Sequence, residues 1–460
     1  MKTRRWFPAW LAVSIAVMIL AACYPVVNTL PAITATATSP VATITPVPPT
    51  VPPTVPPTAS PTQPLSTTVS PSDTPQPEPP TSIPPTPVLG PAIQHLQSGQ
   101  KIDITYIHML DTKMGWGIGG LSQASDHVFR TQDGGNTWHD VTPPQPAPAS
   151  GDTVAALGYF KDASTGWVAY GPTALGSVPA YILVWSTQDG GGSWTYGAIY
   201  TSSVSAETFS PLYVDFTDNH TGWLLVILGG GMMHEYVALF GTQDGGATWT
   251  DITDPSSQND IQSFPKTGMV FMDSQNGWLT RDAQGVDPAP HVLHTSDGGV
   301  TWTRIDLPAP AGTSGWFDNN ACGIYYPFVL SLSSAVFAMK CLDTSTYKIQ
   351  HDYLYATSDA GNTWQTSPLP ADFTIPDSGG ALYFSDAKTG LAFSRKMVRT
   401  QDGGQSWTPV RLQAVNWDGQ FSFIDMLNIW AVALDSGQIA LVKTSNGGAT
   451  WTDIIPVVAP

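Results

Sequence analysis

The chain is poor in charge, and poorest in positive charge. Asp, Glu, Lys and Arg make up 12% of its 460 residues, about half the usual share. Its 18 Lys and Arg are outnumbered by 35 Asp and Glu, which gives a formal net charge of −17 at pH 7. Nucleic-acid binding rests on clustered cations that contact phosphates. Nucleic acid is therefore excluded as the expected partner, and the surface should be rich in uncharged polar side chains.

Long apolar runs are scarce as well. The main one, residues 6–22, follows the basic start MKTRR and is too short for a comfortable membrane span. It ends in Leu20-Ala21-Ala22-Cys23, which resembles the bacterial lipobox, where small residues precede a cysteine that is lipidated and becomes the new N-terminus. A cleaved signal over residues 1–22 is the favoured interpretation, with an uncleaved anchor helix as the alternative. We expect export, and a lipid on Cys23 that holds the protein at the cell membrane on the extracellular or periplasmic side.

The next segment lacks nearly everything that builds a core. Residues 24–92 hold 21 of the chain's 42 prolines and no Trp, Phe, Lys or Arg. Such a segment cannot bury enough apolar surface to fold and favours extended polyproline II conformations. Its Ser/Thr-Pro composition also suits O-glycosylation. The sequence therefore predicts a disordered stalk over residues 23–92 that carries a folded domain, residues 93–460, away from the membrane.

An eight-residue pattern recurs seven times in that domain, at spacings of 43 to 62 residues, as in repeat architectures. In each copy the acidic side chain can accept backbone N–H groups of a turn, the Gly pair permits positive φ angles, and the Trp is an apolar anchor. We expect these acidic residues to be structural rather than catalytic or metal-binding. They are Asp133, Asp189, Asp244, Asp297, Asp359, Asp402 and the neutral substitute Asn446, within TQDGGNTW (131–138), TQDGGGSW (187–194), TQDGGATW (242–249), TSDGGVTW (295–302), TSDAGNTW (357–364), TQDGGQSW (400–407) and TSNGGATW (444–451).

These copies resemble the Asp box, or BNR repeat, of sialidase-like β-propellers. The resemblance covers the chain from about residue 103 to its end and implies an all-β propeller. The repeats are also similar to those of the photosystem II assembly-factor family, seven-bladed Asp-box propellers that chaperone membrane subunits. The stalk and the acidic balance depart from that family, so the resemblance implies only a general scaffold role.

A second landmark precedes each Asp box and marks a tight turn between two apolar strands. Each repeat then reads strand A, this turn, strand B, a variable loop, strand C, the Asp box and strand D. Four antiparallel strands repeated seven times predict a seven-bladed β-propeller. Whether residues 93–101 add a closing strand stays open. The turns are MLDTKMGW (109–116), FKDASTGW (160–167), FTDNHTGW (216–223), FMDSQNGW (271–278), VLSLSSAV (329–336), FSDAKTGL (384–391) and FIDMLNIW (423–430).

Two cysteines remain besides Cys23. If residues 329–336 form the turn of their repeat, Cys322 and Cys341 lie at the open end of the same hairpin, nearly facing each other. Disulfides persist in exported proteins, so we expect a disulfide, with two unpaired buried thiols as the alternative. His291 and His294 would point to opposite faces of strand C. We expect no metal and no cofactor.

Strand parity sorts the loops onto two faces of the disc. The A–B turns and the Asp boxes share one, here called the Asp-box face, and these turns are uniformly short. The other, here called the elaborated face, carries insertions at 171–179, 229–235, 282–291, 309–322 and 342–352. All of them belong to repeats 2 to 5. Loops on a rigid scaffold are the usual place for function, so a site is expected on the elaborated face.

Candidate ligand-binding side chains on or beside that face are Trp316, Trp417, His234, Tyr236, Arg281 and Tyr325. Trp316 and Trp417 are the two tryptophans of the folded domain without a role in the repeats, and exposed aromatics suit sugar stacking or a protein contact. That they merely cover the core is an equal alternative. Weak candidates for catalytic carboxylates are Glu235, Asp282, Asp318 and Asp352.

Two functions compete. The first is a monomeric binding or scaffold module for an extracellular glycan or protein. The second is a glycoside hydrolase acting on a neutral polysaccharide, which needs only two suitably spaced carboxylates. A sialidase is disfavoured because three convergent arginines cannot be assembled from the six in the folded domain. Fold sharing does not transfer chemistry, so binding is the favoured interpretation.

Overall fold

The structure is a computed structural model that describes residues 87, 89–149, 151–174, 176–201, 204–231, 234–253, 261–282, 290–346, 348, 350, 352–370, 373, 381–386, 388–393, 396–410 and 418–460. All of these belong to one compact unit. The predicted signal, the lipidation site Cys23, most of the predicted stalk and Trp417 lie outside the described residues. Within the described part, no helix has the length and apolarity that a membrane span requires.

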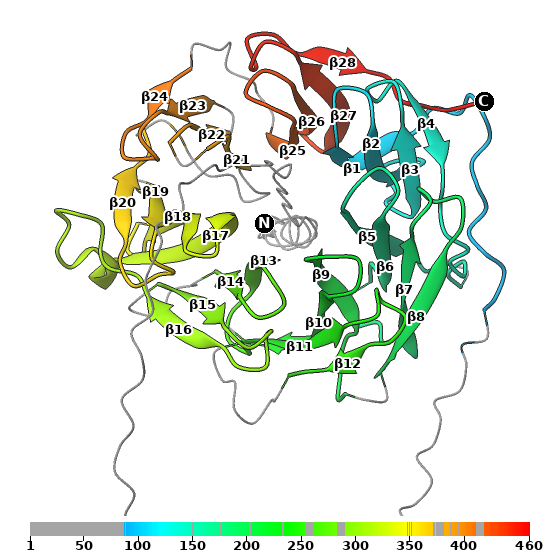
Figure 1. Ribbon diagram of the computed structural model, residues 1–460, viewed down its shortest axis with the longest axis horizontal. Helices are drawn as coiled ribbons and strands as arrows, with labels where there is room; N and C mark the ends of the chain where they lie inside the picture. Colours follow the sequence, from blue (N-terminus) through cyan, green and yellow to red (C-terminus); the bar gives the residue numbers. More distant parts are fainter. Residues whose placement is uncertain are drawn as a thin grey trace, which may run out of the picture. The chain divides into compact units, whose positions relative to one another are not determined.

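Seven antiparallel sheets stand around a central axis, each with its first strand innermost and its fourth outermost (Figure 1). The predicted all-β, seven-bladed propeller is confirmed. The first three blades are β1 (Asp103–Met109), β2 (Gly115–Gly120), β3 (His127–Thr131) and β4 (Thr137–Asp140); β5 (Val154–Phe160), β6 (Gly166–Pro172), β7 (Tyr181–Thr187) and β8 (Thr195–Tyr200); and β9 (Ser210–Phe216), β10 (Gly222–Gly231), β11 (His234–Thr242) and β12 (Thr250–Asp251).

The remaining blades follow the same order. They are β13 (Lys266–Phe271), β14 (Gly277–Arg281), β15 (His291–Thr295) and β16 (Thr303–Asp306); β17 (Asn320–Ser331), β18 (Ser334–Asp343), β19 (Tyr353–Thr357) and β20 (Gln365–Pro368); β21 (Ala381–Phe384), β22 (Gly390–Phe393), β23 (Met397–Thr400) and β24 (Thr408–Pro409); and β25 (Asp418–Phe423), β26 (Ile429–Asp435), β27 (Gln438–Thr444) and β28 (Thr452–Ile454). A short 3₁₀ helix, η2 (Trp316–Asp318), precedes β17, and β29 (Val457–Val458) follows β28.

Each Asp box is a closed set of hydrogen bonds. In the fourth blade, Asp297 accepts the backbone N–H and the hydroxyl of Thr301 and the hydroxyl of Thr295, and Thr295 Oγ1 accepts the N–H of Gly299 at 2.9 Å. Asn446 accepts the hydroxyl of Thr444 and the N–H of Thr450, both at 2.9 Å. A neutral amide therefore makes the same turn, which explains why it can replace the carboxylate.

The A–B turns and the Asp boxes lie on the same side of the disc because they touch in every blade. Gly298 N–H, in the Asp box, donates to the Gln275 carbonyl of the A–B turn at 2.8 Å. The same bond recurs in the other six blades, and in the fifth it is made by Ala360, whose φ is 57°. This contact fixes the Asp-box face and leaves the B–C loops and blade connections on the opposite face.

The core is divided into seven clusters, and each lies between two neighbouring blades. Along β6, Trp167 and Ala169 face the third blade while Val168 and Tyr170 face the first. This alternation follows from the two-residue period of a strand buried on both faces. A cluster of the same kind joins the seventh blade to the first. The ring is therefore held by blade-to-blade packing all the way round.

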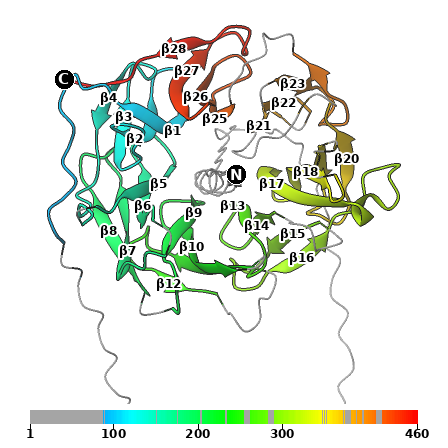
Figure 2. The same cartoon turned by 180° about the vertical axis from the view of Figure 1, so that it is seen from behind.

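The N-terminal segment up to Lys101 and the C-terminal strand both pack on the first blade, and Figures 1 and 2 show the blue segment passing beside the C-terminus from opposite sides. β29 adds to β4 as a fifth strand in parallel orientation. On its other side, Val458 receives the N–H of Gly99 and donates to the carbonyl of Gln100, each at 2.9 Å. Residues 93–101 thus form no regular strand, and the C-terminal strand is the extra closing element that the sequence left open.

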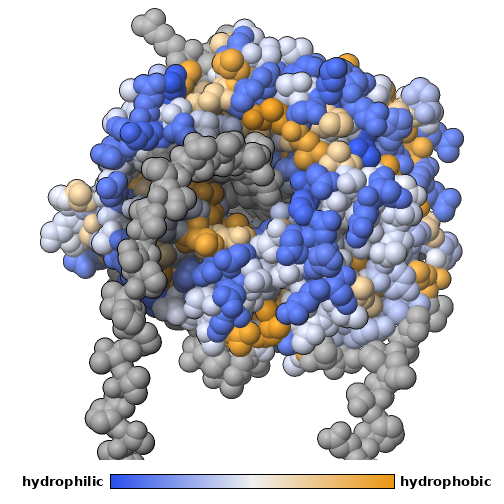
Figure 3. Space-filling model, viewed as in Figure 1, coloured by the Kyte–Doolittle hydropathy of each residue, from blue (hydrophilic) through white to orange (hydrophobic). Residues whose placement is uncertain are grey.

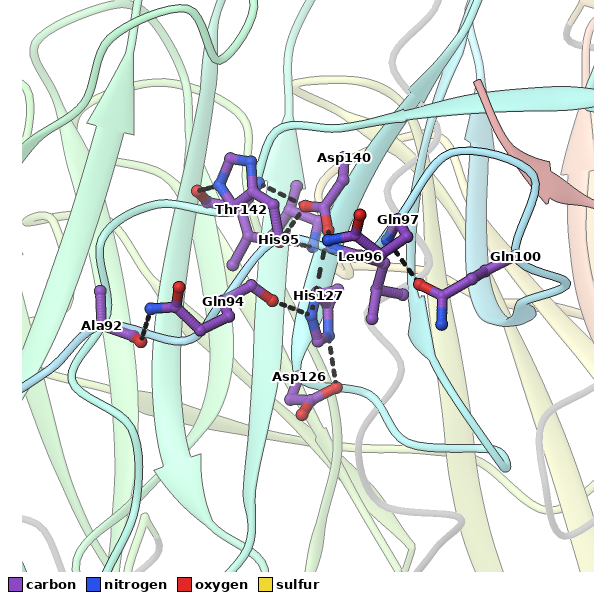
Figure 4. Close-up of polar contacts among 11 residues, drawn as sticks. Ala92, Gln94, His95, Leu96, Gln97, Gln100, Asp126, His127, Asp140 and Thr142 are labelled. Carbon is purple, nitrogen blue, oxygen red and sulfur yellow. Dashed lines mark hydrogen bonds and ion pairs between the residues drawn. The ribbon is translucent and has the colours of Figure 1, made fainter. Parts of the chain in front are cut away.

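The segment before β1 is fastened to the first blade by side chains (Figure 4). Asp140, at the end of β4, accepts the N–H of Leu96 at 2.9 Å. His95 Nε2 lies 2.9 Å from the Thr142 carbonyl. His127, on β3, lies within 3.2 Å of the Gln94 carbonyl and 2.7 Å of Asp126. These contacts hold the segment that links the propeller to residues further upstream.

Candidate functional site

The elaborated face is built by two hairpins that exceed the others in length. β10 and β11 run for 10 and 9 residues and pair as far as Gly231 and His234. β17 and β18 run for 12 and 10 residues and pair as far as Asn320 and Asp343. They belong to the third and fifth blades and flank the fourth. In the view of Figure 3, hydrophilic residues predominate and hydrophobic residues form several separate patches.

The tip of the β10–β11 hairpin presents two rings outward and one carboxylate inward. His234 and Tyr236 are exposed, Tyr236 by 47%, and their ring centroids lie 6.0 Å apart. Glu235, between them, points the other way because neighbouring side chains alternate along a strand. Its Oε2 accepts the backbone N–H of Lys266 at 2.7 Å. The hairpin tip is therefore tied to the start of β13 in the next blade.

The Lys266 side chain also contacts Glu235, from the buried side of the hairpin. The lysine side chain is fully buried, and Nζ donates to the carbonyls of Phe264 (2.6 Å) and Ser263 (3.1 Å) and lies 3.7 Å from Glu235 Oε2. Burial lowers the pKa of Lys266 to about 8 despite the nearby Glu235 charge. Burial also raises the pKa of Glu235, an effect that Lys266 opposes. Removing one partner of such a buried pair is strongly destabilising, because the other charge is left buried without compensation.

A second buried cation lies beside the first. Arg281, at the end of β14, is 1% exposed and its guanidinium stands 4.3 Å above the Phe264 ring. Its Nη2 lies 2.7 Å from His291 Nδ1, and Nη1 lies 3.4 Å from Ser263 Oγ. Arg281 is thus beneath the surface, although the sequence placed it among the candidate ligand-binding residues. It supports the connection between the third and fourth blades.

The fifth-blade hairpin is crossed by a disulfide. Cys322 and Cys341 face each other in the β17–β18 register, with their Cα atoms 4.1 Å apart, and the two sulfurs are bonded. Trp316, on η2, covers this bridge: its Nε1 lies 3.4 Å from Cys341 Sγ and its ring meets Tyr353 edge-on at 5.6 Å. Trp316 is half-buried. It packs on the cluster between the fourth and fifth blades, which favours the interpretation that it covers the core.

The carboxylates of this face have different surroundings. Asp318, on η2, is exposed, whereas Asp352 is 1% exposed. Asp282 is half-buried, and its Oδ1 lies so near Gly323 that a Cβ there would be 2.4 Å away. Asp343 accepts the N–H groups of Ser345 and Thr346 and so closes its own loop. The Ser345 hydroxyl, which also donates to this carboxylate, and the N–H and hydroxyl of Thr346 lower the pKa of Asp343 to about 2.

Tyr325 lies on β17 below the loops and packs against the cluster between the fifth and sixth blades. Of the six candidate ligand-binding residues, the structure therefore brings His234 and Tyr236 together at the surface and places Arg281, Trp316 and Tyr325 in supporting positions. Among the described residues, no group of three or more His, Cys, Asp or Glu is arranged to hold a metal ion.

Sequence reasoning missed Lys266, which holds the hairpin tip, and Asp215, a fully buried carboxyl on β9. Asp215 accepts the N–H of Phe271 on β13 at 2.6 Å, and burial raises its pKa to about 7. Both residues occupy positions in apolar strands. A charged residue inside such a strand was the signal that could have found them.

Comparison with known proteins gives one partial match. A family model described as photosynthesis system II assembly factor YCF48 matches residues 198–312, which include the third and fourth blades. No curated protein matches the chain.

Solved structures share the propeller fold at low identity. The structure of YCF48 bound to a D1 peptide is 16% identical, with 78% of this chain and 99% of that chain covered and a TM-score of 0.48. YCF48 from Cyanidioschyzon merolae is 16% identical, with 76% and 97% covered and a TM-score of 0.48. The GH74 enzyme of Niastella koreensis is 16% identical, with 77% and 62% covered and a TM-score of 0.32. Such values indicate likeness of fold alone.

Proposed function

We propose that this chain is an exported, lipid-anchored propeller that binds a protein partner with its elaborated face and performs no chemistry on it. The observation that carries the proposal is the β10–β11 hairpin, which lifts His234 and Tyr236 into solvent while Glu235 anchors it from below. Aromatic side chains are enriched among the residues that dominate protein interfaces. The hairpin therefore has the form of a contact surface.

The hairpin is held before any partner arrives. Glu235, Lys266 and Ser263 connect it to the next blade by hydrogen bonds, and His234 forms a bridge with Ser263. The Gln262 side chain both donates to the Val237 carbonyl (2.9 Å) and accepts its N–H (2.8 Å) on the outer edge of β11. Because the contact residues are fixed in advance, little conformational entropy is lost on binding.

A protein partner is favoured over a glycan by the position of the family match. The matched residues, 198–312, contain the whole β10–β11 hairpin, Lys266 and Arg281. The family is described as an assembly factor, a role that requires contact with other proteins. The predicted lipid on Cys23 and the predicted stalk would keep the propeller at the outer side of the membrane, where it could meet such partners.

The alternative, a glycoside hydrolase for a neutral polysaccharide, needs two carboxylates that flank the scissile bond. Two carboxylates of the elaborated face are already engaged: Glu235 with Lys266, and Asp343 with its own loop. Glu235 is also covered by its own hairpin, with its side chain 17% exposed. These engagements favour binding over hydrolysis.

The test uses the tagged full-length chain in its native cell envelope, with mild chemical cross-linking before purification. The double variant His234→Ala/Tyr236→Ala should lose the cross-linked protein adducts that the parent retains. The control is Leu332→Ala/Leu427→Ala, which removes two side chains of similar exposure (55% and 56%) from the Asp-box face and should change nothing. In parallel, the parent is incubated with a panel of neutral polysaccharides. Release of reducing ends would establish the hydrolase instead.

A further inference from the structure

We propose that His127 is held as an imidazolium cation and acts as a latch for the N-terminal segment 92–100. In this proposal the attachment of that segment to the first blade, and with it the seating of the closing strand β29, weakens as the pH rises. This latch lies at the junction between the propeller and the upstream chain, and it operates whatever the elaborated face binds.

The two ring nitrogens of His127 face two groups that can only accept hydrogen bonds. Nδ1 lies 2.7 Å from Asp126 Oδ1, and Nε2 lies 3.2 Å from the carbonyl oxygen of Gln94 (Figure 4). A neutral imidazole carries one N–H and one lone pair, whereas the imidazolium carries two N–H groups. With Asp126 ionised, only the cation can satisfy both contacts. Either neutral tautomer would point a lone pair at a carboxylate or at a carbonyl.

The surroundings of His127 reinforce the cation. Its side chain is 7% exposed, and Asp140 Oδ2 lies 3.9 Å from Nε2. The ring of Phe129, on the same strand, lies parallel to the imidazole at 6.0 Å. Tyr170, from β6 of the second blade, is buried nearby. Burial, and to a smaller extent the charges of Asp126 and Asp140, raise the pKa of its phenol. His95, on the segment itself, lies beside Thr142, which hydrogen-bonds Asp140. Among the described residues, the charged groups that act on His127 are therefore the carboxylates of Asp126 and Asp140.

His127 lies where it can control how β29 is held against the first blade. His127 contacts the Gln94 carbonyl, while Asp140 accepts the N–H of Leu96, in the very next peptide group, at 2.9 Å. The chain then runs directly to Gly99 and Gln100, which sandwich Val458 of β29 against β4. Loss of the His127 contact would free the Gln94 carbonyl and loosen the segment that covers β29.

The direction of the pH effect follows from the charges. Burial by itself lowers the pKa of His127, but the hydrogen bond and charge of Asp126, the charge of Asp140 and the Gln94 carbonyl together raise it above the ordinary value. A raised pKa in the folded state means that the stabilisation is complete below about 6.5, the value for an unfolded chain. It is lost as the pH rises through the folded value. The latch thus holds at acidic pH and opens toward alkaline pH.

The test measures hydrogen exchange of residues 93–102 in the full-length chain between pH 6 and pH 9. Rates are normalised to a synthetic peptide of the same residues, which removes the intrinsic effect of pH on exchange. The protection factor should be constant below about pH 6.5, fall by up to about tenfold per pH unit between that value and the raised pKa of His127 in the folded state, and level off above it. His139→Gln, which removes an exposed histidine of the neighbouring strand, should leave this profile unchanged.

Asp126→Asn is the decisive variant. The asparagine amide can donate to Nδ1 while Nε2–H still donates to Gln94, so a neutral His127 satisfies both contacts. The protection factor should then be independent of pH over the same range. The proposal is overturned if the parent and Asp126→Asn share one profile. It is also overturned if ¹⁵N NMR of the histidine rings shows a single protonated nitrogen on His127 in the parent at pH 6.

Discussion

Trp430 in the last blade donates its indole N–H to the carbonyl of Gly134 in the first, at 3.0 Å across 296 residues of sequence. Trp167 makes the same bond to Gly245 in the next blade, and Trp223 makes it to Gly298, both at 2.8 Å. The joint that closes the ring is therefore built like the joints within it. Radial repetition accounts for closure, and β29 is added to it.

This relationship predicts the effect of Trp430→Phe. Phenylalanine keeps an aromatic side chain at position 430, but the buried Gly134 carbonyl loses its hydrogen-bond donor. This loss should lower the unfolding free energy by about 1–3 kcal/mol. Denaturant unfolding of the full-length chain measures it. Trp223→Phe removes the equivalent bond at an interior joint and should cost a similar amount. A Trp430→Phe variant as stable as the parent would show that this joint does not contribute to ring stability.

The Asp box predicts a contrast between two substitutions at one position. Asp297→Ala leaves the N–H of Thr301 without its acceptor and should cost about 1–3 kcal/mol. Asp297→Asn should cost much less, because Asn446 already makes the same turn in the last blade. Melting curves of both variants give the comparison. Equal losses would mean that the negative charge, rather than the hydrogen-bonding geometry, stabilises the turn.

Ala360 predicts a stabilising substitution. It adopts φ 57° at the place where the other Asp boxes have Gly, a conformation that is unfavourable for a residue with a Cβ. Ala360→Gly should stabilise by about 0.5–1 kcal/mol, since the relief of strain exceeds the added flexibility of the unfolded chain. The mirror variant, Gly298→Ala, should destabilise, because its Cβ would lie 2.8 Å from the Ser274 carbonyl. If Ala360→Gly lowers the melting temperature, the assignment of strain there is wrong.

The disulfide and Trp316, which packs on it, should contribute to the unfolding free energy non-additively. Cys322→Ser/Cys341→Ser opens a bridge that spans 19 residues and should cost about 2–4 kcal/mol. Trp316→Ala removes a half-buried ring from the same cluster and should cost about 2 kcal/mol. Because the two sites touch, the triple variant should lose less than the sum. Strict additivity of the unfolding free energies would contradict the packing of Trp316 on the bridge.

The repeats could be predicted from the sequence because each is a local matter. Turn residues such as Asp297 and anchors such as Trp302 act within a few positions of themselves, so their spacing reveals strands, turns and faces. The facing of Cys322 and Cys341 followed from the same hairpin geometry. The addition of β29 to β4 could not be predicted in this way, because a two-residue strand has no pattern of its own and is defined only by what it pairs with.

The candidate site was less accessible to sequence reasoning. Loop length drew attention to residues 229–235, which the structure shows largely as an extension of the β10–β11 hairpin with His234 and Tyr236 exposed. It did not reveal that Arg281 is buried under that hairpin, because burial of a cation depends on partners brought from another blade. The role of Lys266 is equally non-local: its acceptors include Glu235, on the third blade, at a sequence distance of 31 residues.

Site-specific photo-cross-linking shows most directly whether the elaborated face binds a protein. A photoreactive phenylalanine replaces Tyr236 in the full-length chain, and Leu427, which is 56% exposed on the opposite face, in the control. Irradiation in the native envelope is followed by identification of the adducts. If the elaborated face binds a protein, position 236 should give a discrete protein adduct and position 427 none. The same adduct from both positions, or an adduct from position 427 alone, would contradict it.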